Sequence, residues 1–397
     1  MKFKLYIGCV LLALIAPISR AELSIRTTNH YRIHTDLDPG LAEDMARRMD
    51  IMYEEYARRL VDFTPKQDER LFDVYIFTRR EDYLTYTHNR FPNTGGVFVV
   101  GKALAAFLEG QGRDGLRRTL QHEAFHQFAW SAIGPTLPVW LNEGLAQIFE
   151  EGIYDGRTFS IGEVPRRRVL QLQADIDHRT LFEFRGFLAM SDEQWTKNMS
   201  DKPRGAAQYN QAWAMAHYLI FATDDRGQPR FRSRLIDMLK LLHNGKKGEE
   251  AFSEAFSDNI PGFQKMFLQY ARTLSPTPKA TCIENQDILA DMLIELDSQG
   301  RRFSDIETFR DTLVKHQYQM EYTRGSLHWQ SETDPRIYFR DLDGAYMASD
   351  RLYFSPRNGA PLPDIISKPT PTLQLHTRFT QVGRKVEHEI LVERAGR

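Results

Sequence analysis

Two short segments constrain this chain more than any other feature. Residues 122–126 read His-Glu-Ala-Phe-His, and residues 140–146 read Trp-Leu-Asn-Glu-Gly-Leu-Ala. On a helix, side chains four residues apart lie one turn apart on the same face. His122 and His126 can therefore bind one metal ion together, while Glu123 projects from a neighbouring direction as a candidate general base.

A third ligand is expected on the next helix. Gly134-Pro135 ends the first helix, and a helix that begins near Pro138 and runs back brings Glu143 level with the histidines. Glu150 and Glu151 come two turns later and are expected to overshoot the site. Two imidazoles and one carboxylate leave one position of a tetrahedral Zn²⁺ open to water, as in catalytic zinc sites.

Other interpretations of these histidines are less favoured. A motif with a third histidine ligand shortly after the first two is excluded, because Ala129 and Ala132 occupy those positions. A purely structural zinc site would fill the fourth position with cysteine or histidine. A helix that simply exposes two histidines remains the plain alternative.

The two motifs resemble those of the gluzincin zinc metallopeptidases. They are similar to the aminopeptidase-N type, and more so to exported bacterial proteins of the peptidase-MA-like group. The resemblance spans roughly residues 30–275, and only the two motifs are highly specific. It implies Zn²⁺ as cofactor, His122, His126 and Glu143 as its ligands, Glu123 as the catalytic base, and a peptide or protein substrate.

Further residues are candidates for supporting roles. Asn142 and Gln147 could orient the ligating histidines, although both could equally be ordinary amides on a helix surface. Tyr209 is the first candidate for a hydrogen-bond donor to the oxyanion, and His217 is the second. A core or surface tyrosine is the plain alternative at position 209.

A glycine-bounded strand lies just before the first motif. Residues 95–100 could form the edge strand that pairs with an extended peptide, with Gly95, Gly96 and Val97 as substrate-binding residues. Aminopeptidases of the resembling type have an acidic amine-binding motif near this strand. The motif is missing here, so the resemblance does not require aminopeptidase action.

The N-terminus reads as a secretory signal. A short basic start is followed by an apolar run from Leu5 to Ile18, and Ser19 and Ala21 supply the small residues of a cleavage site. We expect residues 1–21 to be removed and the protein to be secreted or periplasmic, with no stable membrane span afterwards. An uncleaved membrane anchor is the alternative.

Charge and cysteine content exclude some classes. The formal net charge is −1, and loss of Lys2, Lys4 and Arg20 with the signal would make it −4, which argues against a nucleic-acid partner. Without Cys9 in the signal, Cys282 is the one cysteine left, so no internal disulfide can form. The oligomeric state cannot be predicted from these features.

The pattern of apolar residues predicts an α+β fold. A strand–helix part over residues 22–105 and a mainly helical part over 106–275 would form one zinc metallopeptidase-like domain over 22–275. Asp114 is the expected N-cap of the helix that carries the first motif. Strands are expected at 31–35, 71–77 and 95–101, and helices at 39–60, 164–176, 207–223, 229–243 and 261–273.

The remainder, residues 280–397, is expected to be a C-terminal α+β domain of unknown role. Ser304 to Glu307 form a capping box, and residues 373–379 and 386–392 alternate as a hairpin. The prolines between 356 and 371 indicate an irregular connection. The arginines at 166–168 are expected to be a solvated helix face.

The sequence therefore favours an exported zinc metallopeptidase. Two alternatives stay open: an envelope or interaction protein that keeps the metal site without turnover, and a zinc hydrolase that acts on a non-peptide bond.

Overall fold

The N-terminal part is a five-stranded sheet covered by helices on both faces. The computed structural model describes residues 23–63, 71–324 and 327–395; the expected signal at 1–21 lies outside them. The elements of this part are β1 (Ser24–Thr27), β2 (Tyr31–Thr35), α1 (Pro39–Arg59), β3 (Phe72–Phe77), α2 (Arg80–Tyr86), β4 (Gly96–Val99) and β5 (Ala103–Phe107).

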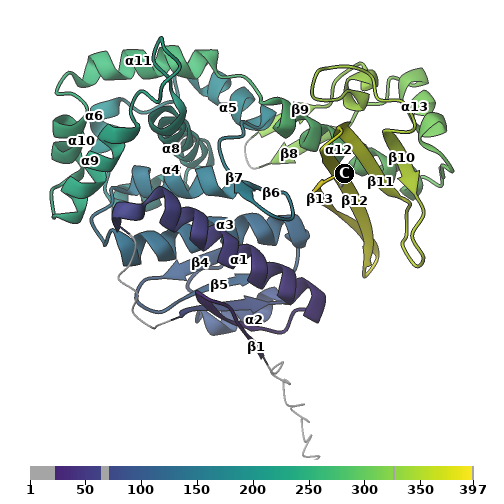
Figure 1. Cartoon of the computed structure of the whole chain (residues 1–397), viewed down its shortest axis with the longest axis horizontal. Helices are drawn as coiled ribbons and strands as arrows, with labels where there is room; N and C mark the ends of the chain where they lie inside the picture. Colours follow the sequence, from purple (N-terminus) through teal and green to yellow (C-terminus); the bar gives the residue numbers. More distant parts are fainter. Residues whose placement is uncertain (1–22, 64–70, 325–326, 396–397) are drawn as a thin grey trace, which may run out of the picture.

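The strand order of this sheet is β1-β2-β3-β5-β4, with β2, β3 and β5 parallel and both edge strands antiparallel. Side chains alternate between the two faces. Val74 and Leu104 enter the main core beneath α1 and α3 (Gly112–Ala132), whereas Phe77 and Phe107 pack with Tyr83 of α2 on the opposite face. Figure 1 shows α1 and α3 on one side of the sheet and α2 on the other.

The helical part follows α3 and shares its core. Trp140, Trp213 and Phe252 are among the large side chains fully buried there. Its elements are α4 (Val139–Glu150), β6 (Ile153–Tyr154), β7 (Phe159–Ser160), α5 (Arg166–Asp177), α6 (Phe184–Leu188), α7 (Asp192–Met199), α8 (Lys202–Phe221), α9 (Arg232–His243), α10 (Gly248–Ala255) and α11 (Ile260–Thr273).

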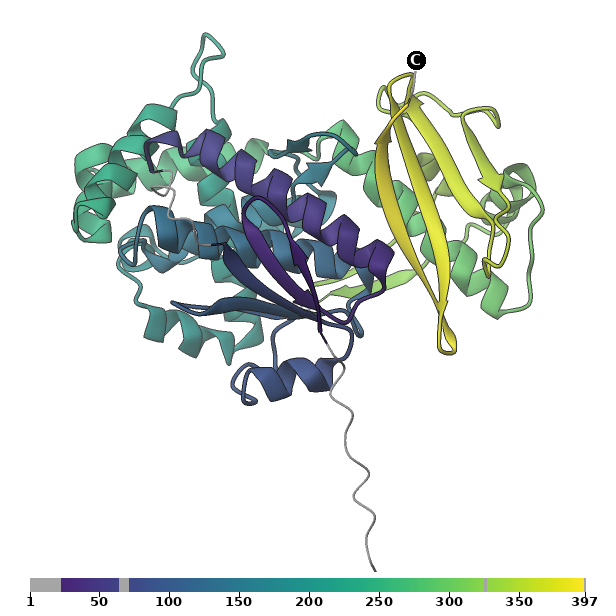
Figure 2. The same ribbon diagram turned by 60° about the horizontal axis from the view of Figure 1, so that its bottom comes forward.

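The C-terminal part has a core of its own, built from Leu289, Phe309 and Phe379 among others. Its elements are α12 (Pro278–Ser298), α13 (Ile306–Lys315), β8 (Glu321–Arg324), β9 (Leu327–Gln330), β10 (Leu352–Ser355), β11 (Asp364–Thr370), β12 (Leu373–Val382) and β13 (Lys385–Arg394). Strands β10 to β13 form an antiparallel sheet in sequence order. Figure 2 shows the long β12–β13 hairpin beside the N-terminal part, and β13 packs on α3.

The α+β fold class is confirmed, but four details differ from expectation. The helix expected to open with a capping box at Ser304 is α13, and its N-cap is Asp305, whose side chain accepts from Thr308 N. Strand β5 was not predicted, because its five residues are all buried and show no alternation. The proline-rich stretch contains strand β11 rather than an irregular connection. Asp114 lies in the first turn of α3, whose N-cap is Gln111; its Oδ2 accepts a hydrogen bond from Ile390 N of β13 at 2.8 Å.

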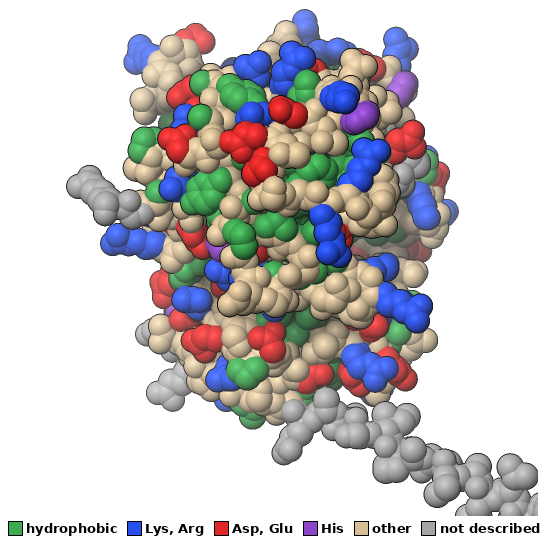
Figure 3. Space-filling view, turned by 90° about the vertical axis from the view of Figure 1, so that its right-hand side faces the viewer, with side chains coloured by type: hydrophobic (Ala, Val, Ile, Leu, Met, Phe, Trp, Pro, Cys, Tyr) green, Lys and Arg blue, Asp and Glu red, His purple; other side chains and the backbone are tan. Residues whose placement is uncertain are grey.

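The surface of the C-terminal part mixes charges of both signs. Figure 3 shows acidic and basic side chains interspersed over this face, with apolar side chains between them. The described part of this face therefore offers no strong field of one sign. Among the described residues, no helix combines the length and the apolar character that crossing a membrane requires.

Candidate metal centre

The centre lies in the hairpin of α3 and α4, and local sequence fixes this hairpin. Gly134 ends α3 with a positive φ of 103°, a backbone conformation that glycine adopts without strain. Gln121 then joins the two helices, since its Nε2 donates to the last carbonyls of α4, at 2.8 Å from Phe149 O. Phe125 stacks on Phe149 with ring centroids 5.1 Å apart. These contacts set α3 and α4 antiparallel and side by side.

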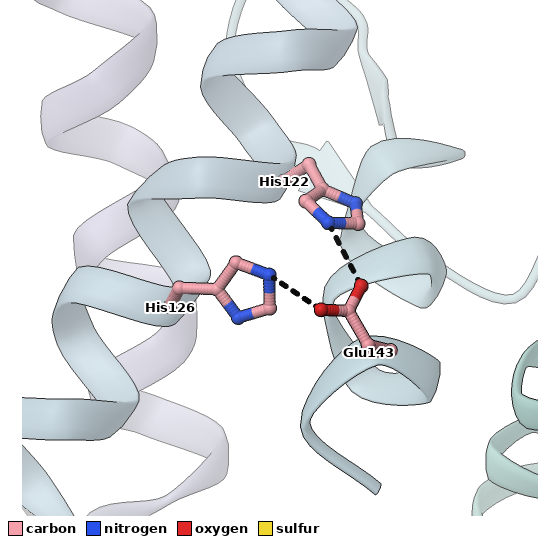
Figure 4. A group of neighbouring side chains, drawn as sticks. All are labelled: His122, His126 and Glu143. Carbon is pink, nitrogen blue, oxygen red and sulfur yellow. Dashed lines mark ion pairs between the residues drawn. The ribbon is translucent and has the colours of Figure 1, made fainter. Parts of the chain in front are cut away.

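Three potential ligands converge between the two helices. Nε2 of His122 lies 3.3 Å from Oε2 of Glu143, and Nε2 of His126 lies 3.6 Å from Oε1 of the same carboxylate. All three ligand atoms lie within 4.8 Å of one another. Figure 4 shows both imidazoles pointing from one helix at the carboxylate on the next. The expected juxtaposition of Glu143 with the two histidines is present.

This donor set fits a zinc ion. Glu143 Oε2 is buried and makes no well-oriented hydrogen bond with any residue that the structure describes, despite its closeness to His122. This is costly for a carboxylate oxygen unless another partner supplies the interaction. Imidazole nitrogen and carboxylate oxygen are ligands that zinc accepts, and three of them leave a fourth position open.

Each histidine has an outer partner at Nδ1, which leaves Nε2 for the ion. Asn142 Oδ1 lies 3.0 Å from Nδ1 of His126, as expected for an orienting residue. Glu150 Oε2 lies 3.1 Å from Nδ1 of His122, although the sequence led us to expect Glu150 to overshoot. Because α4 runs antiparallel to α3, moving two turns past Glu143 leads back from His126 towards His122. The spacing of seven residues on α4 could have revealed this contact.

Gln147 does not orient a histidine, contrary to expectation. Its Nε2 donates to the main-chain oxygens of Tyr209 at 2.9 Å and Glu143 at 3.3 Å, and its Oε1 accepts from Arg168 at 2.7 Å. Gln147 thus joins α4 to α8 and α5. Although it follows Glu143 by one turn of α4, its side chain is buried against α8 and α5 and makes its hydrogen bonds there.

Tyr209 lies beside the ligand carboxylate, brought there by a close helix contact. A side-chain carbon at Gly144 would lie 2.4 Å from Ala212 O, so this glycine lets α4 and α8 approach one another. Burial raises the pKa of Tyr209, and the neighbouring Glu143 raises it further, so its hydroxyl stays a donor. His217, two turns later on α8, instead contacts Tyr270 of α11.

Glu123 faces the edge strand β4. Its Oε2 accepts a hydrogen bond from Phe98 N at 2.8 Å. Because Phe98 directs its main-chain N–H away from β5, Gly96, two residues before it, shares that outward orientation. The candidate base and the open edge of the sheet therefore meet at the centre.

The expected substrate strand is an edge strand, but its outward residues differ from those expected. Gly95 O accepts from Phe107 N at 3.4 Å and from Gln111 Nε2 at 2.9 Å, so this carbonyl is already engaged. Val97 pairs with β5 and shares the inward orientation of Gly95. Of the three predicted residues, Gly96 is the one whose main-chain N–H and C=O point away from β5. Phe98, which was not predicted as a substrate-binding residue, has the same orientation. The sequence could not show which alternate residues face β5.

Electrostatics at the centre favour a positive charge between the carboxylates. Burial lowers the pKa of His122, but Glu143, Glu150 and Glu123 together raise it well above the ordinary value of 6.5. Burial raises the pKa of Glu143, but His126, His122 and Tyr209 lower it below its ordinary value. A cation that binds at the centre must displace the His122 proton and replaces its charge.

The arginines at 166–168 are not a solvated face. Arg167 and Arg168 are largely buried and both bind Glu151, at 2.5 and 3.0 Å. The isolated charge run gave no sign of this, because its partners lie on other elements. Glu151 follows α4 directly, so these arginines lie next to Glu150 of the candidate metal centre.

Comparison with known proteins adds one similarity. Residues 117–228 match a family described as "Protein of unknown function (DUF1570)", and no curated protein matches the chain. The matched stretch covers less than half of the chain and includes both histidines, Glu143 and Tyr209. What the chain resembles over these residues is thus a family whose description carries no activity.

Proposed function

We propose that this protein is an exported zinc-dependent hydrolase of the gluzincin type that cleaves peptide bonds. The convergence of His122, His126 and Glu143, with ligand atoms within 4.8 Å of one another, carries the proposal. The nearby Glu123 and the open edge of β4 support hydrolysis of an extended substrate over storage of a metal ion.

The chemistry follows from what each side chain can do. Bound zinc would polarise the scissile carbonyl and lower the pKa of water to about 7. Glu123 accepts the proton of the attacking water at a carboxylate oxygen and returns it to the leaving nitrogen. Phe98 N holds that carboxylate in place through its 2.8 Å hydrogen bond.

Two further groups complete the proposed site. The Tyr209 hydroxyl, kept protonated beside Glu143, donates a hydrogen bond to the developing oxyanion. An extended peptide pairs with the outward main-chain groups of Gly96 and with the carbonyl of Phe98, whose N–H stays bound to Glu123, in the manner of an added strand. Asn142 and Glu150 hold the two imidazoles with Nε2 turned inward.

The test combines metal analysis with turnover. Wild type and Glu123→Gln are each assayed for zinc content and for cleavage of a mixed peptide library, with the exposed Glu250→Gln as matched control. We expect about one zinc per chain in all three proteins, and cleavage by wild type and the control alone. Zinc uptake without cleavage by wild type would overturn the peptidase proposal and favour an inactive or non-peptide role.

A further inference from the structure

A network of charged side chains begins behind the metal centre. Glu151, directly after α4, is almost completely buried and binds the guanidinium groups of Arg167 and Arg168 at 2.5 and 3.0 Å. Arg168 also donates to Gln147 Oε1 at 2.7 Å and lies over the Trp213 ring. The two arginines are therefore held by several groups of α4 and α8.

The network continues into the C-terminal part. Glu284 of α12 binds Arg167 at 3.4 Å, and its other oxygen accepts from Arg166 N at the start of α5 at 2.8 Å. The carboxylates of Glu151 and Glu284 thus share Arg167. A residue 141 positions after Glu143 in the chain is in this way linked to the helix that carries the metal ligands.

Glu150 lies where this network meets the metal centre. Its Oε2 is 3.1 Å from His122 Nδ1 and 4.0 Å from Arg168 Nη2. One carboxylate oxygen thus lies between an imidazole and a guanidinium. This oxygen of Glu150 contacts the His122 imidazole more closely than it contacts Arg168, because Arg168 is bound by Glu151 at 3.0 Å.

The number of carboxylates around the two arginines keeps Glu150 in contact with His122. Three carboxylates, those of Glu150, Glu151 and Glu284, face Arg167 and Arg168. If Glu284 loses its charge, Glu151 remains as the ion-pair partner of Arg167 among the described residues, and Arg167 then competes more strongly with Arg168 for the Glu151 carboxylate. Arg168 then turns to Glu150, in competition with His122. Glu150, Glu151, Arg167 and Glu284 line a cavity of about 690 Å³ between the two parts, so these four side chains have room to rearrange around Arg168.

We infer that the C-terminal part positions the metal ligand His122 through Glu284, Arg167, Arg168 and Glu150. Glu150 is the positioning residue that orients the imidazole, and Glu284 keeps Glu150 available for it. This inference rests on the proposed metal site but not on peptide cleavage, and it gives residues 280–397 a role in metal binding.

A second contact between the two parts serves as a comparison. Glu332 lies 3.7 Å from Arg166, next to the network, and its side chain is half exposed. Loss of its charge removes a carboxylate from the same boundary without touching Arg167, Arg168 or Glu150. Glu332→Gln therefore controls for a general loosening of the interface.

The experiment measures metal affinity in the full-length protein. The zinc Kd is determined by competition with a chelator for wild type, Glu150→Gln, Glu150→Asp, Glu284→Gln and Glu332→Gln. The visible absorption of each Co²⁺-substituted protein reports ligand geometry, and thermal unfolding confirms that each variant is folded. None of these readouts depends on turnover.

We expect Glu150→Gln to raise the zinc Kd about 10- to 100-fold, with partial rescue by Glu150→Asp. Glu284→Gln should raise it about 3- to 10-fold and alter the Co²⁺ spectrum, while Glu332→Gln leaves both unchanged. The inference would be overturned if Glu284→Gln had the same zinc Kd and the same Co²⁺ spectrum as wild type. It would also be overturned if Glu332→Gln lost as much zinc affinity as Glu284→Gln. If the wild-type protein took up no zinc, the proposed metal site would be wrong, and the inference that Glu284 positions His122 as a metal ligand would be wrong with it.

Discussion

Nδ1 of His122 lies 3.1 Å from Oε2 of Glu150, seven residues after the carboxylate that faces Nε2 of the same ring. Each ring nitrogen of His122 thus lies close to a carboxylate, and both carboxylates belong to α4. A carboxylate at Nδ1 makes Nε2 a stronger donor to a metal ion, because it stabilises the proton on the opposite nitrogen.

Loss of the ligand carboxylate should abolish stabilisation by zinc. At a free zinc concentration 100 times Kd, the wild-type protein should gain about 2.7 kcal/mol in its free energy of unfolding. Glu143→Ala should gain almost nothing, and a chelator should remove the wild-type gain. Denaturant unfolding with and without zinc measures this; Glu250→Ala, exposed and remote in sequence, should behave like wild type.

Gly144 should be intolerant of a single added methyl group. The new carbon would lie 2.4 Å from Ala212 O, a backbone atom that can move only with α8. We expect Gly144→Ala to lower the free energy of unfolding by about 1–3 kcal/mol. At Gly186, where nothing lies within 4 Å, the same change should stabilise by about 0.4–1 kcal/mol. Similar effects at the two sites would contradict the close packing of α4 on α8.

Arg117 should anchor the C-terminal hairpin to α3. Its buried guanidinium binds Glu389 of β13 at 2.7 Å, Asp44 of α1 at 3.0 Å and Asp114 at 2.6 Å. Arg117→Leu leaves the buried Glu389 with the more exposed Arg113, at 3.2 Å, as its remaining cationic partner and should cost about 3 kcal/mol. Arg47→Leu, which removes an exposed partner of Asp44, should cost less than about 1 kcal/mol in the same denaturant titration.

His217 should make the fold sensitive to acid. Burial lowers its pKa to about 4, whereas the unfolded chain has a histidine pKa of about 6.5. As pH falls below 6.5 the unfolded state takes up the proton first, so stability declines until pH reaches about 4. The loss from this residue should approach about 3 kcal/mol.

The measurement compares unfolding free energies between pH 7 and 4 in the presence of a chelator, so that metal binding does not contribute. His217→Gln should lose less stability over this range than wild type, although it is weaker at pH 7 because Tyr270 loses its 2.7 Å partner. His178→Gln, at an exposed site, should follow the wild-type curve. If the free energy of unfolding of His217→Gln fell with pH as steeply as that of wild type, His217 could not be buried in its neutral form.

The helical hairpin around the candidate metal centre could be predicted because its signals are local. The spacing of His122 and His126, the stop at Gly134 and the restart after Pro138 are properties of adjacent residues. They bring Glu143 opposite the histidines whatever the rest of the chain does. The same locality explains why the contact of Asn142 with His126 could be expected.

Charged residues without an amphipathic pattern gave no such signal. The arginines at 166–168 look like a solvated run, since the sequence does not show that Glu151 and Glu284 lie on elements packed against them. Gln147 and the strand residues Gly95 and Val97 were misjudged for a related reason. Which face of α4 meets α8, and which alternate residues of β4 meet β5, depends on partners elsewhere in the chain.

The sequence by itself determined which side chains can bind a metal ion and which helices carry them, because helix periodicity and turn residues act over a few positions. The tertiary structure alone decided which charges are buried together, that Glu150 contacts His122, and that Glu284 belongs to the same network. Pairing of buried charges depends on distances between elements far apart in the chain, and those distances arise only when the two cores pack together.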